Sequence, residues 1–318
     1  VNFNSLQIEN LKFDDLNQLI ADKSFEVDQN KLPKEGWTLI DESAQKLLEK
    51  LKNVGMPLHE YVGGKIYRGI LTGLNEAFVI DEKTKNHLIS EDPDSAELIK
   101  PFLRGRDIKR YEKPISGNYL IFTKRGIDIK QYPAILNYLK KFKTRLEPRP
   151  TDISSIEWKG RKPGNYKWYE IQDAIDYYEE FEKPKIIIPA ITTSANYTLD
   201  NKNIYSNDKT TIISKYDRYL LGVLNSKLSD FIIANISSTK RGGYFEYKPM
   251  YVKQIPIFKA ILEKRNEIES LVDQILNLKQ NDSDADTSNL ESEIDQVVYK
   301  LYGLTEEEIA IVEKTIQM

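Results

Sequence analysis

Apolar positions at helical spacing mark the first predicted core element of this 318-residue chain, between residues 41 and 54. These positions are Ala44, Leu47, Leu48, Leu51 and Val54. Their three- and four-residue spacing places them on one face of a helix, and Gly55 followed by Pro57 predicts its end. Residues 1–37 are only weakly periodic. We therefore expect a lead-in there rather than a core element.

Short apolar runs bounded by turn residues predict β-strands further along the chain. Two are expected at residues 66–68 and 77–80, joined by a turn at 72–75, and two more at 119–122 and 185–188. Helical spacing resumes between these strands and after them. Because strands and helices interleave without a regular βαβ rhythm, the predicted fold class is α+β with a mixed sheet.

Two of the predicted helices follow clear start signals. Pro133 opens the first, and Asp217 is expected to cap the second, which runs to about residue 236. The inward residues of the first are Ile135, Tyr138, Leu139, Phe142 and Leu146. Those of the second are Leu220, Leu221, Leu224, Leu228, Phe231 and Ile232.

The end of the chain has a different, nearly heptad pattern. The apolar positions are Ile261, Ile268, Leu271, Ile275 and Leu278, and after a polar stretch Leu290, Ile294, Val297, Val298 and Leu301. A mobile loop is expected at residues 280–289, and Thr305 with Glu308 predicts a capping box for a last helix. The chain is thus divided into residues 1–57 (lead-in and helix), residues 58–257 (the main domain) and residues 258–318 (a helical C-terminal module). Such helices often pack against a partner, so helix-mediated self-association is an open alternative.

Composition narrows the class of protein. Hydrophobic residues make up 40% and charged residues 30%, there is no cysteine, and no apolar run reaches the roughly 18 residues that a membrane span needs. We expect a soluble cytoplasmic protein without disulfides, signal peptide or membrane contact. Because the sequence begins with Val1 instead of Met, we also expect an excised fragment.

Charge is distributed unevenly along the chain. The formal net charge is -3, yet residues 100–167 hold 18 Lys and Arg against 6 Asp and Glu, a local balance of +12. A basic segment of this kind is a candidate footprint for a nucleic-acid backbone, although Lys-rich stretches are as often solvated helix faces. Charge alone leaves these two interpretations equally open.

Catalytic motifs are absent from the sequence. There is no glycine-rich strand-to-helix turn for a nucleotide cofactor, and the two histidines, His59 and His87, are too few for a metal cluster. Asp94, Glu97 and Lys100 only superficially resemble a metal-dependent nuclease, because Glu97 and Lys100 are one residue too far apart. We expect no catalytic residue, bound cofactor or metal in this chain, and leave a hidden nuclease as an alternative.

Basic residues that alternate with aromatic, glycine and hydroxyl residues indicate binding instead of catalysis. Arg contacts guanine in a bidentate manner, and short hydroxyl side chains can bond to bases or phosphates. The candidate DNA-contacting residues are Arg104, Arg106, Lys109, Arg110, Lys124, Arg125, Lys143, Arg145, Arg161, Lys162, Tyr166, Lys167, Ser238, Thr239, Lys240 and Arg241. For any one of them a solvated turn or an ion pair is the rival interpretation.

Several motifs in order resemble one family. The run Ile-Lys-Pro-Phe-Leu-Arg-Gly-Arg-Asp-Ile-Lys-Arg-Tyr at 99–111 resembles the signature of the TaqI-like C-terminal specificity domain of bacterial adenine-specific DNA methyltransferases. Segments 69–78, 178–187, 221–228, 237–243 with 254–257, and 294–305 agree with it in order. The resemblance covers roughly residues 38–318.

The resemblance implies that residues 58–257 are a target-recognition domain for double-stranded DNA in a restriction-modification enzyme of type IIG character. A separate methyltransferase domain would bind S-adenosylmethionine, extrude the target adenine and methylate its N6 atom. This chain lacks the Asn-Pro-Pro-Tyr tetrapeptide of that domain, so we expect it to be inactive alone. The recognised DNA sequence, and whether the parent also cleaves DNA, do not follow from these motifs. A protein-interaction module acting through the C-terminal helices is the alternative.

Overall fold

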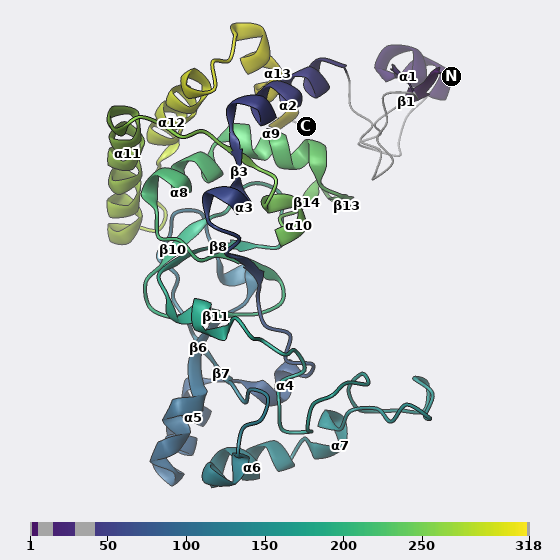
Figure 1. The fold of residues 1–318 in the computed structure, drawn as a ribbon, viewed down its shortest axis with the longest axis vertical. Helices are drawn as coiled ribbons and strands as arrows, with labels where there is room; N and C mark the ends of the chain where they lie inside the picture. The colour runs from purple at the N-terminus through teal and green to yellow at the C-terminus, as the bar shows by residue number, and fades with distance from the viewer. Residues whose placement is uncertain (1, 6–14, 29–41, 317–318) are drawn as a thin grey trace.

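The computed structural model describes residues 2–5, 15–28 and 42–316. The molecule is elongated, with a helical layer at one end, β-sheets in the middle, and α5 and α6 at the other end (Figure 1). The α-helices are α1 (Leu16–Lys23), α2 (Glu42–Val54), α3 (Leu58–Tyr61), α4 (Asn75–Phe78), α5 (Glu82–Glu91), α6 (Pro133–Lys140), α7 (Lys143–Leu146), α8 (Arg218–Asn225), α9 (Lys227–Ile236), α10 (Pro249–Val252), α11 (Leu262–Asn281), α12 (Ser288–Leu301) and α13 (Glu306–Ile316). Short 3-10 helices span Pro93–Leu98, Gly105–Asp107, Ile129–Gln131 and Tyr178–Glu182.

The strands are short and form several sheets. They are β1 (Asn2–Ser5), β2 (Phe25–Asp28), β3 (Met56–Pro57), β4 (Ile66–Arg68), β5 (Val79–Ile80), β6 (Ile99–Leu103), β7 (Asn118–Ile121), β8 (Lys185–Pro189), β9 (Ile191–Thr192), β10 (Thr198–Asp200), β11 (Tyr205–Ser206), β12 (Thr210–Ile213), β13 (Thr239–Lys240), β14 (Tyr244–Glu246) and β15 (Pro256–Ile257). Two four-stranded sheets have the orders β10-β8-β12-β4 and β11-β6-β7-β5. Since β11 pairs with β6 in parallel and the neighbouring pairs are antiparallel, the predicted α+β class with a mixed sheet is confirmed.

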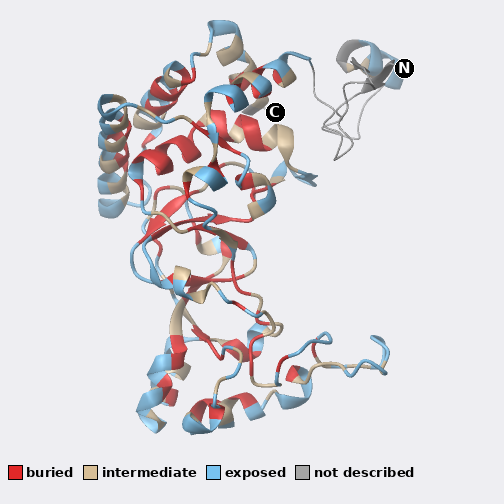
Figure 2. Ribbon diagram, viewed as in Figure 1, coloured by how far each residue is buried: buried red, intermediate tan, exposed pale blue. Residues whose placement is uncertain are grey.

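Strand β8 lies between two hydrophobic cores. Ile186 and Ile188 face the first core, whereas Ile187 faces the second. Successive side chains of a strand point to opposite faces, so a strand covered on both sides must be apolar at every position. This accounts for the continuous Ile-Ile-Ile run, and Figure 2 shows the buried colour along the whole strand.

The C-terminal helices belong to the first core. Ile268, Leu271 and Ile275 of α11 are buried there, together with residues of α2, α8 and α9. Helix α11 approaches α8 so closely that a Cβ added to Gly222 would lie 2.6 Å from Ile268 Cγ2. The middle of the nearly heptad face is therefore covered within the chain, whereas Ile261 and Leu278 at its two ends are exposed. Self-association through the C-terminal helices stays a prediction. The division of the chain at residues 57 and 257 also stays a prediction, although the first core contains residues from 1–57, 58–257 and 258–318.

The predicted helices are present, and the details of three boundaries differ. The segment predicted as one helix from Asp217 is two, because Ser226 ends α8 and its side chain caps α9. The helix that begins at Pro133 is interrupted after Lys140 and resumes as α7. The loop after α11 is shorter than expected, since α12 begins at Ser288.

Two further local predictions concern the last helix and the first pair of strands. Thr305 and Glu308 form the predicted capping box through both backbone amides. The strand predicted at residues 77–80 is shorter in the structure. Helix α4 continues to Phe78, so only Val79 and Ile80 are extended, and the turn expected at residues 72–75 leads directly into α4. About half of the predicted lead-in, residues 1, 6–14 and 29–37, lies outside the described residues. None of the described helices has the length and apolar composition of a membrane span.

Candidate functional site

The loop after β6 holds its basic residues in different ways. The Arg104 guanidinium donates to both carboxylate oxygens of Asp107, at 2.9 and 3.1 Å, and the Arg104 backbone amide donates to the same group. Although burial opposes it, these hydrogen bonds lower the pKa of Asp107. Lys109 forms an ion pair of 3.4 Å with Glu112, whereas Arg106 is exposed and has no carboxylate partner among the described residues. Arg106 is therefore the free cation of this loop.

Arg110 points into the molecule. Its guanidinium donates to the backbone carbonyls of Ala195 and Asn225, at 2.8 and 2.5 Å, and to the Glu291 carboxylate at 2.5 Å. All of these acceptors are internal, so the geometry favours a structural role for Arg110 over the DNA contact predicted from the sequence. Gly105 is structural as well, because a Cβ there would lie 2.5 Å from the Lys209 carbonyl oxygen.

Arg161 organises an extended segment that we call the arm, residues 147–168, which follows α7. Its side chain is 4% exposed and donates to backbone carbonyls only. The acceptors are Leu146 at 2.7 Å, Thr72 at 3.1 Å, Glu170 at 2.8 Å, Lys167 at 3.3 Å and Trp168 at 3.0 Å. Burial lowers the pKa of Arg161 to about 10. The residue fastens the arm to the body, so the geometry favours a structural role over the predicted DNA contact.

Two further candidates belong to the same internal cluster. Arg125 donates to the carbonyls of Ile171 and Gln172, at 2.6 and 2.5 Å. Tyr166 is 7% exposed, donates to the Lys162 carbonyl, and has the guanidinium carbons of Arg125 and Arg161 at 4.9 and 4.4 Å from its ring centroid. A ring enclosed in this way cannot stack on a base. The geometry again favours structural roles over the predicted contacts.

The remaining candidates between β7 and the arm are exposed. Lys143 and Arg145 form ion pairs with Glu147 at 3.8 Å and Glu76 at 2.7 Å. Lys124 lies 4.3 Å from the centroid of the Tyr178 ring and has no carboxylate partner in the described part of the chain. Exposed ion pairs contribute little to stability and can exchange partners easily.

A β-hairpin presents the last group of candidates. Strands β13 and β14 are joined by residues 241–243, and Gly242 and Gly243 have φ values of 86° and 74° that favour glycine. Lys240 forms an ion pair of 3.1 Å with Glu246, and the Ser238 hydroxyl lies 3.0 Å from that of Tyr251. Thr239 is exposed on β13, and Arg241 is exposed at the turn without a carboxylate partner in the described ranges. In Figure 1 the hairpin and the arm project toward the same side of the molecule.

The structure thus divides the sixteen predicted residues into three groups. Arg161 and Tyr166 are buried, and Arg110 and Arg125 are part-buried and donate to backbone carbonyls. Seven residues are exposed or half-buried: Thr239 on β13, and Arg104, Lys109, Lys143, Arg145, Ser238 and Lys240, which each have an ion pair or hydrogen bond within the chain. The exposed cations that lack a carboxylate partner among the described residues are Arg106, Lys124, Lys162, Lys167 and Arg241. They come from the loop after β6, the end of β7, the arm and the hairpin tip, and these are the residues free to meet phosphates.

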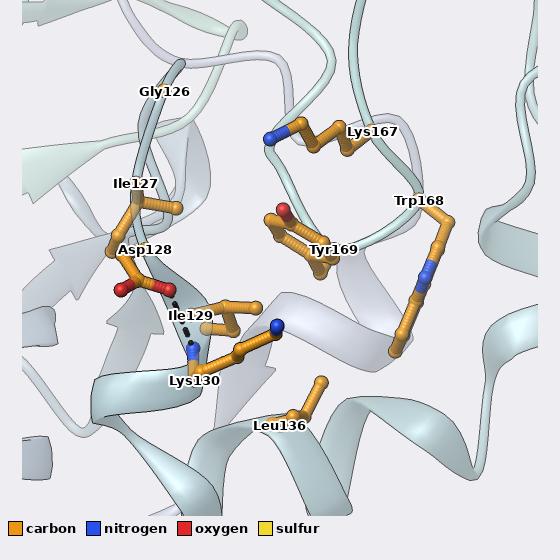
Figure 3. Close-up of a pocket in the computed structure, with 9 residues that line it drawn as sticks. All are labelled: Gly126, Ile127, Asp128, Ile129, Lys130, Leu136, Lys167, Trp168 and Tyr169. Atoms are coloured by element: carbon orange, nitrogen blue, oxygen red, sulfur yellow. Dashed lines mark hydrogen bonds between the residues drawn. The ribbon is translucent and has the colours of Figure 1, made fainter.

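A hollow of about 440 Å³ lies where the arm returns to the body. Trp168 and Tyr169 line it from the arm side, and Lys130 and Leu136 line it from the start of α6 and the turn before it. Figure 3 shows the Lys130 and Lys167 side chains reaching its rim from opposite sides. Lys130 and Leu136 were not among the sequence candidates. The Lys167-Trp168-Tyr169 run was a signal for the site, but its partner loop at residues 126–130 is too far away in sequence to be paired with it.

The acidic residues that superficially resemble a nuclease site have separate partners. Glu97 accepts from the Tyr132 hydroxyl at 2.9 Å, whereas Lys100 pairs with Glu182 at 3.1 Å. Among the described residues no group of three or more His, Asp or Glu side chains could hold a metal. The described part likewise offers no glycine-rich strand-to-helix turn: Gly63, Gly64, Gly242 and Gly243 lie in turns at positive φ.

Comparison with known proteins places this arrangement in a family. The model of the TaqI-like C-terminal specificity domain matches residues 100–257, which includes most of the run at 99–111. This segment, just under half of the chain, is thus similar to this family of specificity domains.

Curated relatives agree with this assignment. The chain is 26% identical over 285 residues to the type II methyltransferase M.PaeR7I of Pseudomonas aeruginosa, which covers 86% of this chain and 44% of that protein. It is 24% identical over 290 residues to the type II methyltransferase M.XhoI of Xanthomonas vasicola, which covers 87% of this chain and 47% of that protein. The chain therefore spans less than half the length of these relatives.

One solved structure shows the same fold. The type IIL restriction-modification enzyme MmeI, determined in complex with DNA, matches with a TM-score of 0.57 and 17% identity over 80% of this chain and 35% of that one. At this identity the likeness concerns the arrangement of elements and leaves individual contacts open.

Proposed function

We propose that this chain reads a double-stranded DNA sequence as the specificity domain of a type II DNA methyltransferase that modifies adenine at N6. The curated relatives are type II methyltransferases and the matched family is one of specificity domains, which supports the assignment. A methyltransferase part of the whole protein would bind S-adenosylmethionine and extrude the target base. The proposed activity of the whole protein is methylation, and its proposed location is the cytoplasm, where its DNA lies.

The β13–β14 hairpin is the observation that carries the proposal. The major groove of B-DNA is wide enough for a two-stranded β-ribbon. This ribbon has Lys240 and Arg241 at its tip and Ser238 and Thr239 at its base. Arg241 forms no ion pair with a carboxylate among the described residues, whereas Lys240 is paired with Glu246. We propose that it enters the major groove while Arg106 and Lys162 contact phosphates. Phosphate contacts position the protein, and base contacts in the groove then determine the sequence.

Fluorescence anisotropy with a random-sequence duplex at several salt concentrations tests this. The affinity of wild type should fall steeply with salt, because each neutralised phosphate releases counterions. Lys162→Ala should weaken binding and lower the slope of log K against log salt by about one. Arg241→Ala should weaken binding and also reduce sequence preference, once a preferred site has been selected.

Lys314→Ala is the matched control, because Lys314 is an exposed cation on α13 with no carboxylate partner in the described ranges. It removes the same charge and should leave both affinity and slope unchanged. Equal losses in all three variants would indicate a general charge effect and contradict the hairpin assignment. Binding that is insensitive to salt would contradict DNA recognition itself.

The alternative of a protein-interaction module has less support. Its main signal was the heptad-like tail, and Ile268, Leu271 and Ile275 of that tail are buried within the chain.

A further inference from the structure

The hollow beside the arm combines aromatic, cationic and apolar groups. Trp168 and Tyr169 lie edge to face, with ring centroids 5.5 Å apart at an interplanar angle of 83°. In Figure 3 the Trp168 indole is seen edge-on at one side of the hollow, so one of its faces looks across toward Tyr169 and Lys130, and Leu136 lies below. The volume of about 440 Å³ falls within the roughly 300–1,000 Å³ of small-molecule sites.

The charges at the rim favour an anion. Lys130 and Lys167 are exposed and form no ion pair with a carboxylate among the residues that the structure describes. A hydrogen bond to the Tyr169 side chain, helped by the charges of Glu170 and Asp128, raises the pKa of Lys167. Lys167 Nζ lies 5.6 Å from the centroid of the Tyr169 ring. One carboxylate, Asp128, also lines the hollow, but it already accepts from the Lys130 backbone amide and from Gln131 Nε2, both at 3.3 Å. The rim therefore carries two ammonium groups against one carboxylate, so its charge is positive on balance.

The aromatic wall is held rigidly from behind. Arg161 donates to the backbone carbonyls of Lys167 and Trp168, and Thr123 Oγ1 donates to that of Tyr169 at 2.5 Å. The backbone carbonyl of each of these three residues thus accepts a hydrogen bond from a side chain, Arg161 of the arm or Thr123 of the body. A preformed wall loses less conformational entropy when a ligand binds, which is the physical benefit of a built site.

We propose that this hollow binds an unstacked nucleotide of DNA, with its base against the Trp168 indole and its phosphate between Lys130 and Lys167. An aromatic face beside cations is the usual means of holding an unpaired base, because every base has a π-face and a neighbouring phosphate. The inference rests on the proposed function, since unstacked nucleotides arise when a DNA duplex is opened or a base is extruded. The site would thereby add recognition of distorted DNA to the reading of paired sequence.

Anisotropy with two fluorescein-labelled duplexes tests the proposal: one fully paired, and one with a single unpaired thymidine at its centre. Wild type should bind the second about tenfold more tightly, since stacking on one aromatic side chain is worth roughly 5- to 150-fold per base. Trp168→Ala should abolish this preference and leave affinity for the paired duplex little changed. Trp168→Phe should retain much of the preference, because it keeps an aromatic face.

Two controls separate the site from general effects. Lys130→Ala should reduce the preference, whereas Lys140→Ala, on the neighbouring helix and bonded to Asn137 at 3.1 Å, should not. Circular dichroism of each variant verifies that the fold is retained. If paired DNA binds and the preference is absent, or survives in Trp168→Ala, the nucleotide site is refuted and the proposed function stands. If neither duplex binds, the proposed function itself fails and the nucleotide site fails with it.

Discussion

The guanidinium of Arg110 lies 2.5 Å from the carboxylate of Glu291, a residue 181 positions later in the chain. The contact joins the loop after β6 to α12, and the same guanidinium also donates to the carbonyls of Ala195 and Asn225. One side chain thus connects the basic loop, the turn after β9, the end of α8 and the C-terminal helices. We regard it as a structural tie between the region matched by the family model and the helices that follow it.

Removing this tie should lower stability. In Arg110→Met two carbonyls lose this donor and the partly buried Glu291 carboxylate keeps the Thr287 hydroxyl but loses its cation, so the free energy of unfolding should fall by roughly 2–4 kcal/mol. Urea denaturation followed by circular dichroism measures this. Glu291→Gln keeps an acceptor and should cost less. A stability equal to that of wild type would show that Arg110 is not a structural residue.

Arg161 and Lys162 are neighbours in sequence with opposite expected roles. Arg161→Met removes five carbonyl contacts, so the arm should become a preferred site of limited proteolysis while the rest of the chain resists. Lys162→Met should leave proteolysis unchanged and weaken DNA binding instead. Mass spectrometry of the fragments locates the cut. The assignment is contradicted if both variants are cleaved equally.

Lys185 and Asp200 form a fully buried ion pair, with 0% exposure of both side chains and 2.5 Å between Nζ and the carboxylate. Burial lowers the pKa of Lys185, and Asp200 opposes that shift. Lys185→Met would leave Asp200 with only the backbone amides of Lys202 and Ile204, and should cost about 3–5 kcal/mol. The double variant Lys185→Met/Asp200→Asn should recover part of that loss in thermal or urea denaturation. A double variant less stable than the single one would argue against an unpaired charge as the cause.

Asp295 should make stability depend on pH. Burial raises its pKa to about 6, against the partly opposing hydrogen bond from the Lys227 backbone amide at 2.8 Å. A carboxyl whose pKa is raised on folding binds its proton more tightly in the folded state. Its contribution to stability is therefore complete below the unfolded pKa of about 3.9 and is lost as the pH rises through 6.

Asp295→Asn keeps an oxygen for the Lys227 amide but cannot ionise. Relative to wild type, it should be more stable at pH 8 by on the order of 2–3 kcal/mol, with little difference near pH 4. Urea denaturation at the two pH values measures this, and the comparison between variant and wild type removes the titration of other groups such as Asp230. An equal effect at both pH values would contradict the assignment.

Helices and buried strands followed from periodicity because packing on a core requires it. Leu47, Leu48 and Leu51 are buried as their spacing predicts, and the apolar run of β8 is buried on both faces. Helix boundaries were harder to predict where one residue both ends a helix and caps the next. Ser226 ends one helix and caps the next, and its sequence context alone does not distinguish that from a continuous helix.

The roles of the arginines could not be separated by sequence. Arg106 and Arg110 lie in one basic run, yet one is exposed and the other donates to internal carbonyls. The guanidinium satisfies a bare carbonyl as readily as a phosphate, so only the position of distant acceptors decides between them. The same holds for Arg161 and Lys162, where the acceptors come from positions as distant as Thr72.

The close approach of α11 to α8 at Gly222 has a consequence for chimeric enzymes. A graft that ends at residue 257 would separate Ile268 and Val272 of α11 from the surface of α8 that they cover. Both apolar faces would then be exposed to solvent. Transplanting specificity between relatives should succeed in either of two sizes: the whole body from α2 through α13, or only the hairpin tip and the outer part of the arm, with Arg161 left in place.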